Sequence, residues 1–179
     1  KNYFQVGGKI KKLKQHLLNN FAIYSVILAC LVVLGVAVFI TNKPKVETVD
    51  TSMFKVVTLK EALELFETDD AKLLVMSVPT CTATIGYTPY LQIVQAKQRY
   101  HTYYLDLTTI DTYSEDFKKL QEKLDLEYNF MGTIDKFSKF IENTPSTVII
   151  KNKKQVFGHI GSISTNTLEL YVKRYGVGQ

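Results

Sequence analysis

The uncharged run from Phe21 to Ile40, FAIYSVILACLVVLGVAVFI, is the feature that most constrains how this chain can fold. The run is twenty residues long and contains neither a charged residue nor a proline. At a helical rise of about 1.5 Å per residue it would extend for roughly 30 Å, which is the thickness of the hydrocarbon core of a bilayer. We therefore predict a transmembrane helix over residues 21–41.

An apolar run of this kind has two alternative interpretations, the core helix of a soluble protein and a cleaved signal peptide. A buried helix rarely continues for this length without one polar face. The apolar region of a signal peptide is usually shorter, about 7–15 residues, and a small-x-small cleavage site follows it. Here the run ends with Val38-Phe39-Ile40-Thr41, so the sequence favours an uncleaved anchor.

The net charge of +5 is confined to residues 1–20, which hold five lysines and no acid. The remaining 17 basic and 17 acidic residues balance, so we predict that nucleic acid is not a partner. Lysines before an apolar run and mixed charges after it place the N-terminus in the cytoplasm. We expect a basic arm (1–20) that meets anionic headgroups, and an extracellular C-terminal domain anchored in the cell membrane.

Beyond a polar linker (42–53), residues 54–179 alternate between strand and helix patterns. Strands are predicted at 54–57, 71–78, 102–107, 147–151 and 155–160, and helices at 58–67, 84–100, 114–128, 134–141 and 164–175. A turn is predicted at 152–154. This alternation is typical of an α/β fold with a mixed central sheet flanked by helices.

The chain has two cysteines, Cys30 and Cys81. Cys30 lies within the apolar run, where it fits as a small apolar side chain. Cys81 is then the only thiol outside the membrane, which excludes a disulfide framework and a cysteine metal cluster within one chain. The histidines lack metal-ligand spacing, so we predict neither a metal nor a cofactor. Cys81 ends an apolar run and precedes a helix, whose N-terminus favours a thiolate.

The order of elements around Cys81 resembles the thioredoxin fold. Pro89 lies eight residues after Cys81, where thioredoxins bend the helix that follows the active cysteine. The stretch NTPSTVIIKNKKQVFGHIGSIS, residues 143–164, is similar to the second half of that family. The resemblance covers residues 54–175 except an insertion near 128–142. It implies that Pro145 is preceded by a cis peptide bond and lies against Cys81, and that Thr80, Thr144 and Pro145 contact substrate.

Three positions depart from the family pattern. Thr84 stands where a second cysteine would resolve a mixed disulfide, although its hydroxyl can still donate a hydrogen bond to the Cys81 sulfur. Thr80 replaces the usual tryptophan, and Val75 replaces the usual buried acid. The loop Val78-Pro79-Thr80-Cys81 resembles the active loop of membrane-anchored bacteriocin transport accessory proteins of Gram-positive bacteria.

Three interpretations of Cys81 stay open at this stage. In the first, Cys81 and Thr84 form a degenerate catalytic site that acts as a monothiol on a secreted peptide or a partner protein. In the second, the domain is a redox-silent binding or assembly module, such as a secretion accessory or a chaperone. In the third, Cys81 is an unreactive buried cysteine. The missing second cysteine argues against turnover as an ordinary dithiol oxidoreductase.

Overall fold

The structure is a computed structural model that describes residues 14–15, 18, 20–41 and 46–179. Four lysines of the predicted basic arm, Lys1, Lys9, Lys11 and Lys12, lie outside the described residues, as does part of the predicted linker (42–45). The chain divides into two compact units with the boundary between Lys45 and Val46. Each unit is described by itself.

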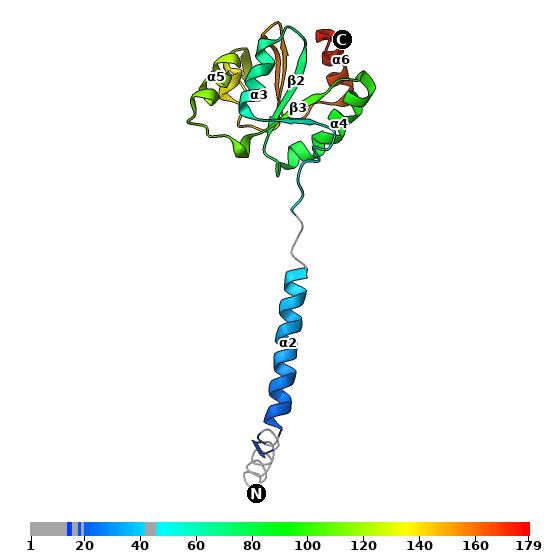
Figure 1. Cartoon of the computed structure of the whole chain (residues 1–179), viewed down its shortest axis with the longest axis vertical. Helices are drawn as coiled ribbons and strands as arrows, with labels where there is room; N and C mark the ends of the chain where they lie inside the picture. Colours follow the sequence, from blue (N-terminus) through cyan, green and yellow to red (C-terminus); the bar gives the residue numbers. More distant parts are fainter. Residues whose placement is uncertain (1–13, 16–17, 19, 42–45) are drawn as a thin grey trace. The chain divides into compact units, whose positions relative to one another are not determined.

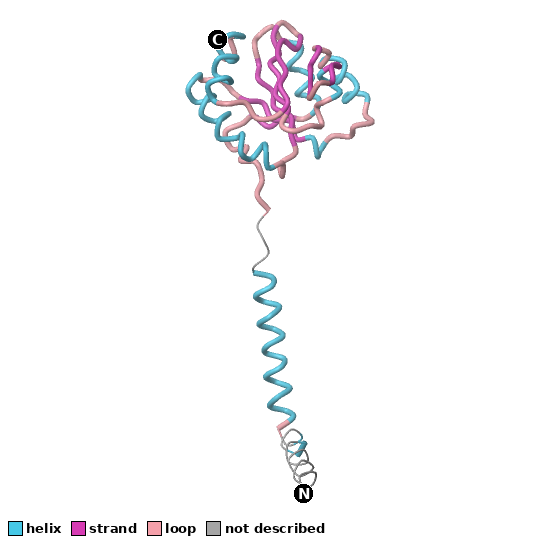
Figure 2. The backbone as a smooth tube through the Cα atoms, turned by 180° about the vertical axis from the view of Figure 1, so that it is seen from behind, coloured by secondary structure: helices cyan, strands magenta, loops and turns pink. Residues whose placement is uncertain are grey.

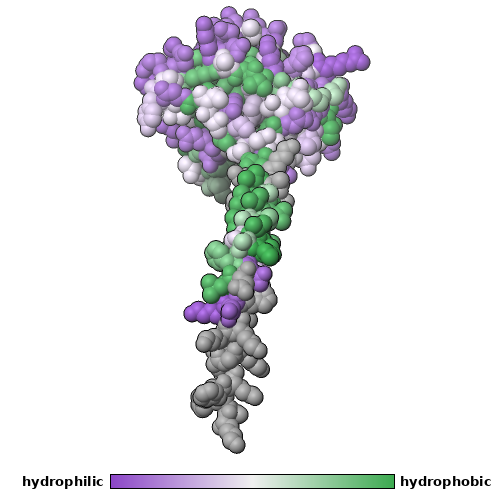
Figure 3. All heavy atoms as spheres, turned by 60° about the horizontal axis from the view of Figure 1, so that its bottom comes forward, coloured by the Kyte–Doolittle hydropathy of each residue, from purple (hydrophilic) through white to green (hydrophobic). Residues whose placement is uncertain are grey.

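In the first unit the apolar run forms α2, Phe21–Thr41, a helix of 21 residues. Its side chains are exposed wherever they are described, and hydrophobic residues cover its surface (Figure 3). The stretch Phe21–Val38 is long and apolar enough to cross a membrane. A helix that leaves this much apolar surface uncovered is stable only in contact with a nonpolar phase or another protein.

The second unit is built on a five-stranded mixed sheet, whose strands β2 and β3 are labelled in the upper part of Figure 1. Its strands are β1 (Lys55–Val57), β2 (Lys72–Ser77), β3 (Thr102–Asp106), β6 (Ser146–Lys151) and β7 (Lys154–Ile160). Their order across the sheet is β1-β3-β2-β6-β7. The first three strands are parallel, and β6 and β7 are antiparallel to their neighbours. This is the predicted mixed sheet, in a thioredoxin-like order.

Helices cover both faces of this sheet (Figure 2). They are α3 (Leu59–Glu64), α4 (Thr82–Gln98), α5 (Glu115–Lys123) and α6 (Thr165–Tyr175), with short 3-10 turns at Leu65–Glu67, Leu107–Thr109 and Phe137–Lys139. On one face α3 contacts α5, and on the other α4 contacts α6. The capping box predicted by the sequence at Thr58 and Glu61 is present at the start of α3.

The strand β2 is apolar throughout because it is buried on both faces. Leu73 and Val75 pack in the cluster beneath α4 and α6. Leu74 and Met76 pack in the cluster beneath α3 and α5. Side chains alternate between the faces of a strand, so Ser77 continues the row of Leu73 and Val75 on the face covered by α4.

One predicted helix is wrong, and the helix predicted over 114–128 is too long, because α5 ends at Lys123. Residues 134–141 do not form a helix; instead β4 (Glu127–Phe130) and β5 (Thr133–Lys136) form a two-stranded hairpin, and the turn Phe137–Lys139 follows. Met131 and Gly132 both adopt positive φ, at 51° and 89°, which closes a tight turn of the type that joins antiparallel strands. The aromatic residues of β4 then pack on Phe137 and Phe140, which a helical reading of the pattern missed.

Residues 46–53, which the sequence assigned to the linker, are part of the second unit. Val49 is buried, and its N–H donates to the carbonyl of Pro79 at 2.8 Å. The Gln95 side chain donates from Nε2 to the carbonyl of Met53 at 2.6 Å. The chain that enters the domain therefore contacts both α4 and the loop that carries Cys81.

Candidate functional site

Cys81 lies where the end of β2 turns into α4. It is the N-cap residue of α4, with extended backbone angles, and its N–H donates to the carbonyl of Val78 at 3.0 Å. Its own carbonyl accepts the first helical hydrogen bond, from Ile85 N–H at 2.9 Å. The N–H groups of the first turn of a helix have no partner within the helix, so those of α4 are free to stabilise negative charge on the Cys81 sulfur.

The loop before β6 supplies the second wall of the site. The peptide bond between Thr144 and Pro145 is cis, as the family resemblance implies. The Cys81 thiol donates to the Thr144 carbonyl over 3.5 Å from Sγ to O. Pro145 is buried, and its carbonyl accepts from Gly161 N–H at 2.8 Å. The structure thus brings three residues of the predicted site together, while the predicted Thr80 is exposed on the turn just before Cys81.

Opposing influences act on the pKa of the half-buried Cys81 thiol. Burial raises this pKa, while hydrogen bonding by the side chains of Thr144 and Thr84 and by the N–H groups of Thr84 and Ala83 lowers it. Together the hydrogen bonds outweigh the effect of burial, so the pKa of Cys81 lies below the ordinary value for a cysteine. A lowered pKa increases the fraction of thiolate, which is the nucleophilic form.

Thr84 is completely buried beneath Cys81. Its hydroxyl shares a short hydrogen bond with the hydroxyl of Ser77, and its carbonyl accepts from the Thr88 hydroxyl at 2.8 Å. Ser77 is completely buried as well. Thr84 has no thiol and so cannot resolve a mixed disulfide, but it connects the sulfur to a polar cluster in an otherwise apolar core.

The position of the expected buried acid is occupied by Val75, which is completely buried. In the sheet Val75 pairs with Tyr104 of β3 on one side and with Thr147 of β6 on the other. The Thr147 hydroxyl donates to the Tyr87 hydroxyl at 3.5 Å. Three hydroxyl groups thus lie close to the place where the family has a carboxylate.

Tyr104 is 2% exposed, and its hydroxyl has no hydrogen-bond partner within the described part of the chain. Burial raises the pKa of Tyr104 to about 12, with a smaller contribution from the Asp106 carboxylate. Ser77 lies close enough to lower the pKa of Tyr104, although no hydrogen bond joins the two hydroxyls, and the charge of Cys81 raises it. Both Ser77 and Cys81 therefore affect the pKa of the Tyr104 hydroxyl. Sequence reasoning missed Ser77 and Tyr104, because only the register of the strands reveals their proximity.

An apolar hollow of about 200 Å³ adjoins the loop that carries Cys81. Val78 lines it from the active loop, Ile141 from the segment that precedes Thr144, and Phe117 from α5. Leu107 and Ile110, which follow β3, complete its apolar lining. The hollow has the size and character to hold one apolar side chain of a bound peptide.

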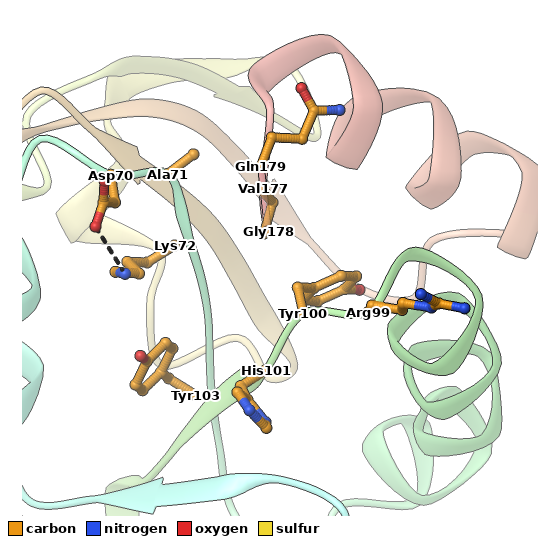
Figure 4. Close-up of a pocket in the computed structure, with 10 residues that line it drawn as sticks. All are labelled: Asp70, Ala71, Lys72, Arg99, Tyr100, His101, Tyr103, Val177, Gly178 and Gln179. Carbon is orange, nitrogen blue, oxygen red and sulfur yellow. Dashed lines mark hydrogen bonds and ion pairs between the residues drawn. The ribbon is translucent and has the colours of Figure 1, made fainter.

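A second hollow, of about 220 Å³, lies at the opposite edge of the sheet (Figure 4). It is bordered by Lys72, Arg99, His101 and the residues around Gly178, and Asp70 pairs with Lys72 at 3.4 Å. This hollow is found where β2 and β3 begin, whereas Cys81 follows the end of β2, so it takes no part in the chemistry of the thiol.

Within residues 14–15, 18, 20–41 and 46–179, no three His, Cys, Asp or Glu side chains come together as a metal site would require. Cys30 and Cys81 are both free thiols.

Comparisons with family models and with curated proteins each found no match. Among solved structures, a chain from work on the thiol-resolving mechanism of a yeast mitochondrial 1-Cys peroxiredoxin via glutathione and thioredoxin systems is similar to this chain, with 19% identity and a TM-score of 0.46 over 69% of this chain and 96% of that one. A thioredoxin from Plasmodium falciparum is 13% identical, with a TM-score of 0.46 over 68% and 98%. Mitochondrial thioredoxin 3 from Saccharomyces cerevisiae is 20% identical, with a TM-score of 0.46 over 69% and 96%.

Proposed function

We propose that the protein is a membrane-anchored monothiol of the thioredoxin type, in which Cys81 forms mixed disulfides with peptides or proteins outside the cytoplasm. The observation that carries this proposal is the placement of the only thiol of the domain at the N-terminus of α4, 3.5 Å from the Thr144 carbonyl and with a lowered pKa. A cysteine in a position that stabilises its thiolate is suited to attack a disulfide.

The proposed reaction is an exchange without net oxidation. The Cys81 thiolate attacks one sulfur of a substrate disulfide, a new disulfide forms between Cys81 and that sulfur, and the other substrate sulfur leaves as a thiolate. Because Thr84 has no thiol, a second thiol from the substrate or from another molecule must attack the mixed disulfide. That step releases the Cys81 thiolate and leaves the substrate sulfur bonded to the resolving thiol.

We propose that α2 anchors the protein in the membrane, with the basic arm in the cytoplasm and the domain from residue 54 outside the cell. The length and apolar surface of α2 support the anchor, and the lysines that precede it support this orientation. An oxidising compartment outside the cytoplasm would supply disulfides to the proposed reaction.

Secreted peptides are the substrates that we propose. The apolar hollow, which Val78 lines three residues before Cys81, offers space for one apolar side chain of a bound peptide. Thr80 is exposed on the same loop. Bacteriocins belong to this class, and the resemblance of Val78–Cys81 to the loop of bacteriocin transport accessory proteins supports them as candidates.

A binding or assembly module without redox chemistry is the second candidate function. The observation in its favour is the complete burial of Thr84 and its bond to Ser77, which makes the threonine a well-fitted part of the core. In this case the surface around Pro145 and the apolar hollow would bind a partner through noncovalent contacts alone.

The test is to incubate the full-length chain in detergent micelles with a peptide that contains one disulfide and an apolar side chain next to it. We expect the probe peptide to form a mixed disulfide with Cys81, detected by mass spectrometry on the proteolytic fragment that contains Cys81. The adduct should persist in Cys30→Ser, disappear in Cys81→Ser, and become transient in Thr84→Cys, which regains a resolving thiol. Binding of the probe without any adduct would favour the noncovalent module.

Sidedness is tested separately by adding protease to intact cells. Digestion of the domain is the expected result, and protection of the domain would contradict the proposed orientation.

A further inference from the structure

The buried hydroxyl cluster behind Cys81 has a feature that the proposed exchange reaction does not explain. Ser77 and Thr84 are completely buried and bonded to each other. Tyr104, from the neighbouring strand, brings a third hydroxyl that lacks a partner among the described residues. An unpaired buried hydroxyl destabilises the folded chain, and Tyr104 is the one that lies beside Val75, on the same face of the sheet as Ser77.

We propose that Tyr104 and Ser77 are positioning residues of the Cys81 site, which form with Thr84 a directional chain of hydroxyl groups that ends at the Cys81 thiolate. This inference rests on the proposed role of Cys81 as a nucleophile. The chain would occupy the place where the family has a buried acid, because Tyr104 lies beside Val75 in the sheet.

Counting hydrogen atoms gives the chain its direction. Each hydroxyl has one hydrogen to donate and can accept two hydrogen bonds. Thr84 can donate to the sulfur only if Ser77 donates to Thr84, since otherwise the Thr84 hydrogen is used on Ser77. The competing acceptor for Ser77, the Val78 carbonyl, is 3.4 Å away and holds it weakly. A hydrogen bond from Tyr104 to Ser77 would complete the sequence from Tyr104 through Ser77 and Thr84 to the sulfur.

The state of the sulfur decides when the chain closes. As a thiol, Cys81 donates its own hydrogen to the Thr144 carbonyl. As a thiolate, Cys81 can only accept hydrogen bonds. A hydroxyl that donates to the thiolate is polarised and accepts more strongly from the next hydroxyl, so each hydrogen bond in the chain strengthens the others. The unpartnered Tyr104 hydroxyl is the free donor at the start of the series. Asp106, Ser77 and Cys81 each affect the pKa of Tyr104. The Asp106 carboxylate accepts hydrogen bonds from the N–H and the hydroxyl of Thr108 at 2.8 and 2.6 Å.

The test measures how fast Cys81 is alkylated as a function of pH, at the level of its proteolytic peptide, in the full-length chain in detergent micelles. Tyr104→Phe removes only the hydroxyl and keeps the ring in the core. We expect it to lower the thiolate fraction at neutral pH by about twofold, less than the loss of the Thr84 hydroxyl would, because the bond that is lost acts on the sulfur only through Ser77 and Thr84. Tyr100→Phe is the matched control, because its hydroxyl is also buried and unpartnered among the described residues but lies before β3, away from Cys81. It should leave the alkylation profile unchanged.

A double-mutant cycle tests whether the three groups act in series. Ser77→Ala interrupts the chain, so adding Tyr104→Phe to it should cause no further loss of thiolate. Tyr104→Phe with the profile of the unmodified chain would overturn the inference, as would losses that multiply in the double variant. If Ser77→Ala does not fold, the comparison of Tyr104→Phe with Tyr100→Phe still decides.

The disulfide probe and the alkylation profiles together separate this inference from the proposed function. If the unmodified chain forms the Cys81 adduct with the disulfide probe and Tyr104→Phe alkylates identically, only the hydroxyl chain is refuted. If the unmodified chain forms no adduct, the proposed exchange reaction is refuted, whereas the alkylation profiles still report on the chain.

Discussion

Replacing Thr84 with valine isolates what the threonine hydroxyl does for the Cys81 thiolate. Valine keeps the shape of the side chain but cannot form a hydrogen bond, so it removes the contact with Ser77 and the support for the sulfur. The N–H groups of Ala83 and Thr84 and the Thr144 side chain stay in place as the remaining stabilising groups.

The expected magnitude follows from the type of hydrogen bond that is lost. A hydrogen bond to a charged group contributes about 1.5–3 kcal/mol. Cys81 is only half-buried, so water and the remaining donors recover part of this energy, and we expect a net loss of about 1 kcal/mol. One pKa unit corresponds to about 1.36 kcal/mol, so the pKa of the Cys81 thiol should rise by about 0.7.

The assay is the pH dependence of Cys81 alkylation in the full-length chain. Thr88→Val is the matched control: the same substitution one turn along α4, at a residue that is 3% exposed and whose hydroxyl bonds to the Thr84 carbonyl. It should not change the profile. Identical profiles for Thr84→Val and the unmodified chain, or equal shifts in both variants, would refute the assignment of Thr84 to the site.

Three further predictions concern the stability of the domain, measured as the free energy of unfolding in urea. Gln95→Leu should lower it by about 2–4 kcal/mol, because the buried Gln95 side chain pairs with the Met53 carbonyl at 2.6 Å and the Thr102 N–H at 2.7 Å; no loss would contradict this bridge. Gly158→Ala should lower it by about 1–3 kcal/mol, because the added Cβ would lie 2.6 Å from the Phe137 ring, and a neutral result would mean that the ring moves freely. The folded-state pKa of Cys81 is lowered, so the unfolded chain binds more protons between that pKa and about 8.5. The stability of the unmodified chain should therefore rise with pH through this window relative to Cys81→Ser and be lost as the pH falls through the folded-state pKa; parallel curves would contradict the lowered pKa.

The sequence predicts the scaffold well where local pattern and burial agree. The continuous apolar run around Leu73–Met76 identifies the central strand because both of its faces are buried. The turn before Lys154 was expected, and Asn152 and Lys153 adopt the positive φ angles that such a hairpin turn requires. The resemblance carried by residues 143–164 identified the cis bond before Pro145.

The hairpin of β4 and β5 could not be predicted in the same way. The spacing of Ile134, Phe137 and Ile141 is compatible with a helix, but Ile134 is exposed and only Phe137 and Ile141 enter the core. The positive φ of Met131, a residue that rarely adopts it, closes the hairpin, and no local signal in the sequence indicates this. Tertiary packing of Tyr128 against Phe137 therefore overrides the local pattern.

Some residues of the candidate site could be predicted from the sequence and others could not. Cys81, Thr84 and Pro145 could be found from the sequence because each occupies a position within a recognisable motif. Ser77 and Tyr104 could not, because they lie 27 residues apart and meet only through the parallel register that places Tyr104 beside Val75. Pairing between strands that are distant in sequence depends on tertiary structure, which neither composition nor spacing encodes.

The central claim is that the helix N-terminus and its hydroxyl groups lower the pKa of Cys81 and so increase its thiolate fraction, and the pKa of this one thiol tests it most directly. The measurement is the rate of Cys81 alkylation against pH in the full-length Cys30→Ser chain, followed by mass spectrometry. We predict a pKa below the value of about 8.5 for a free cysteine. A pKa at or above that value, or a thiol that resists alkylation at every pH in the folded chain, would contradict the account.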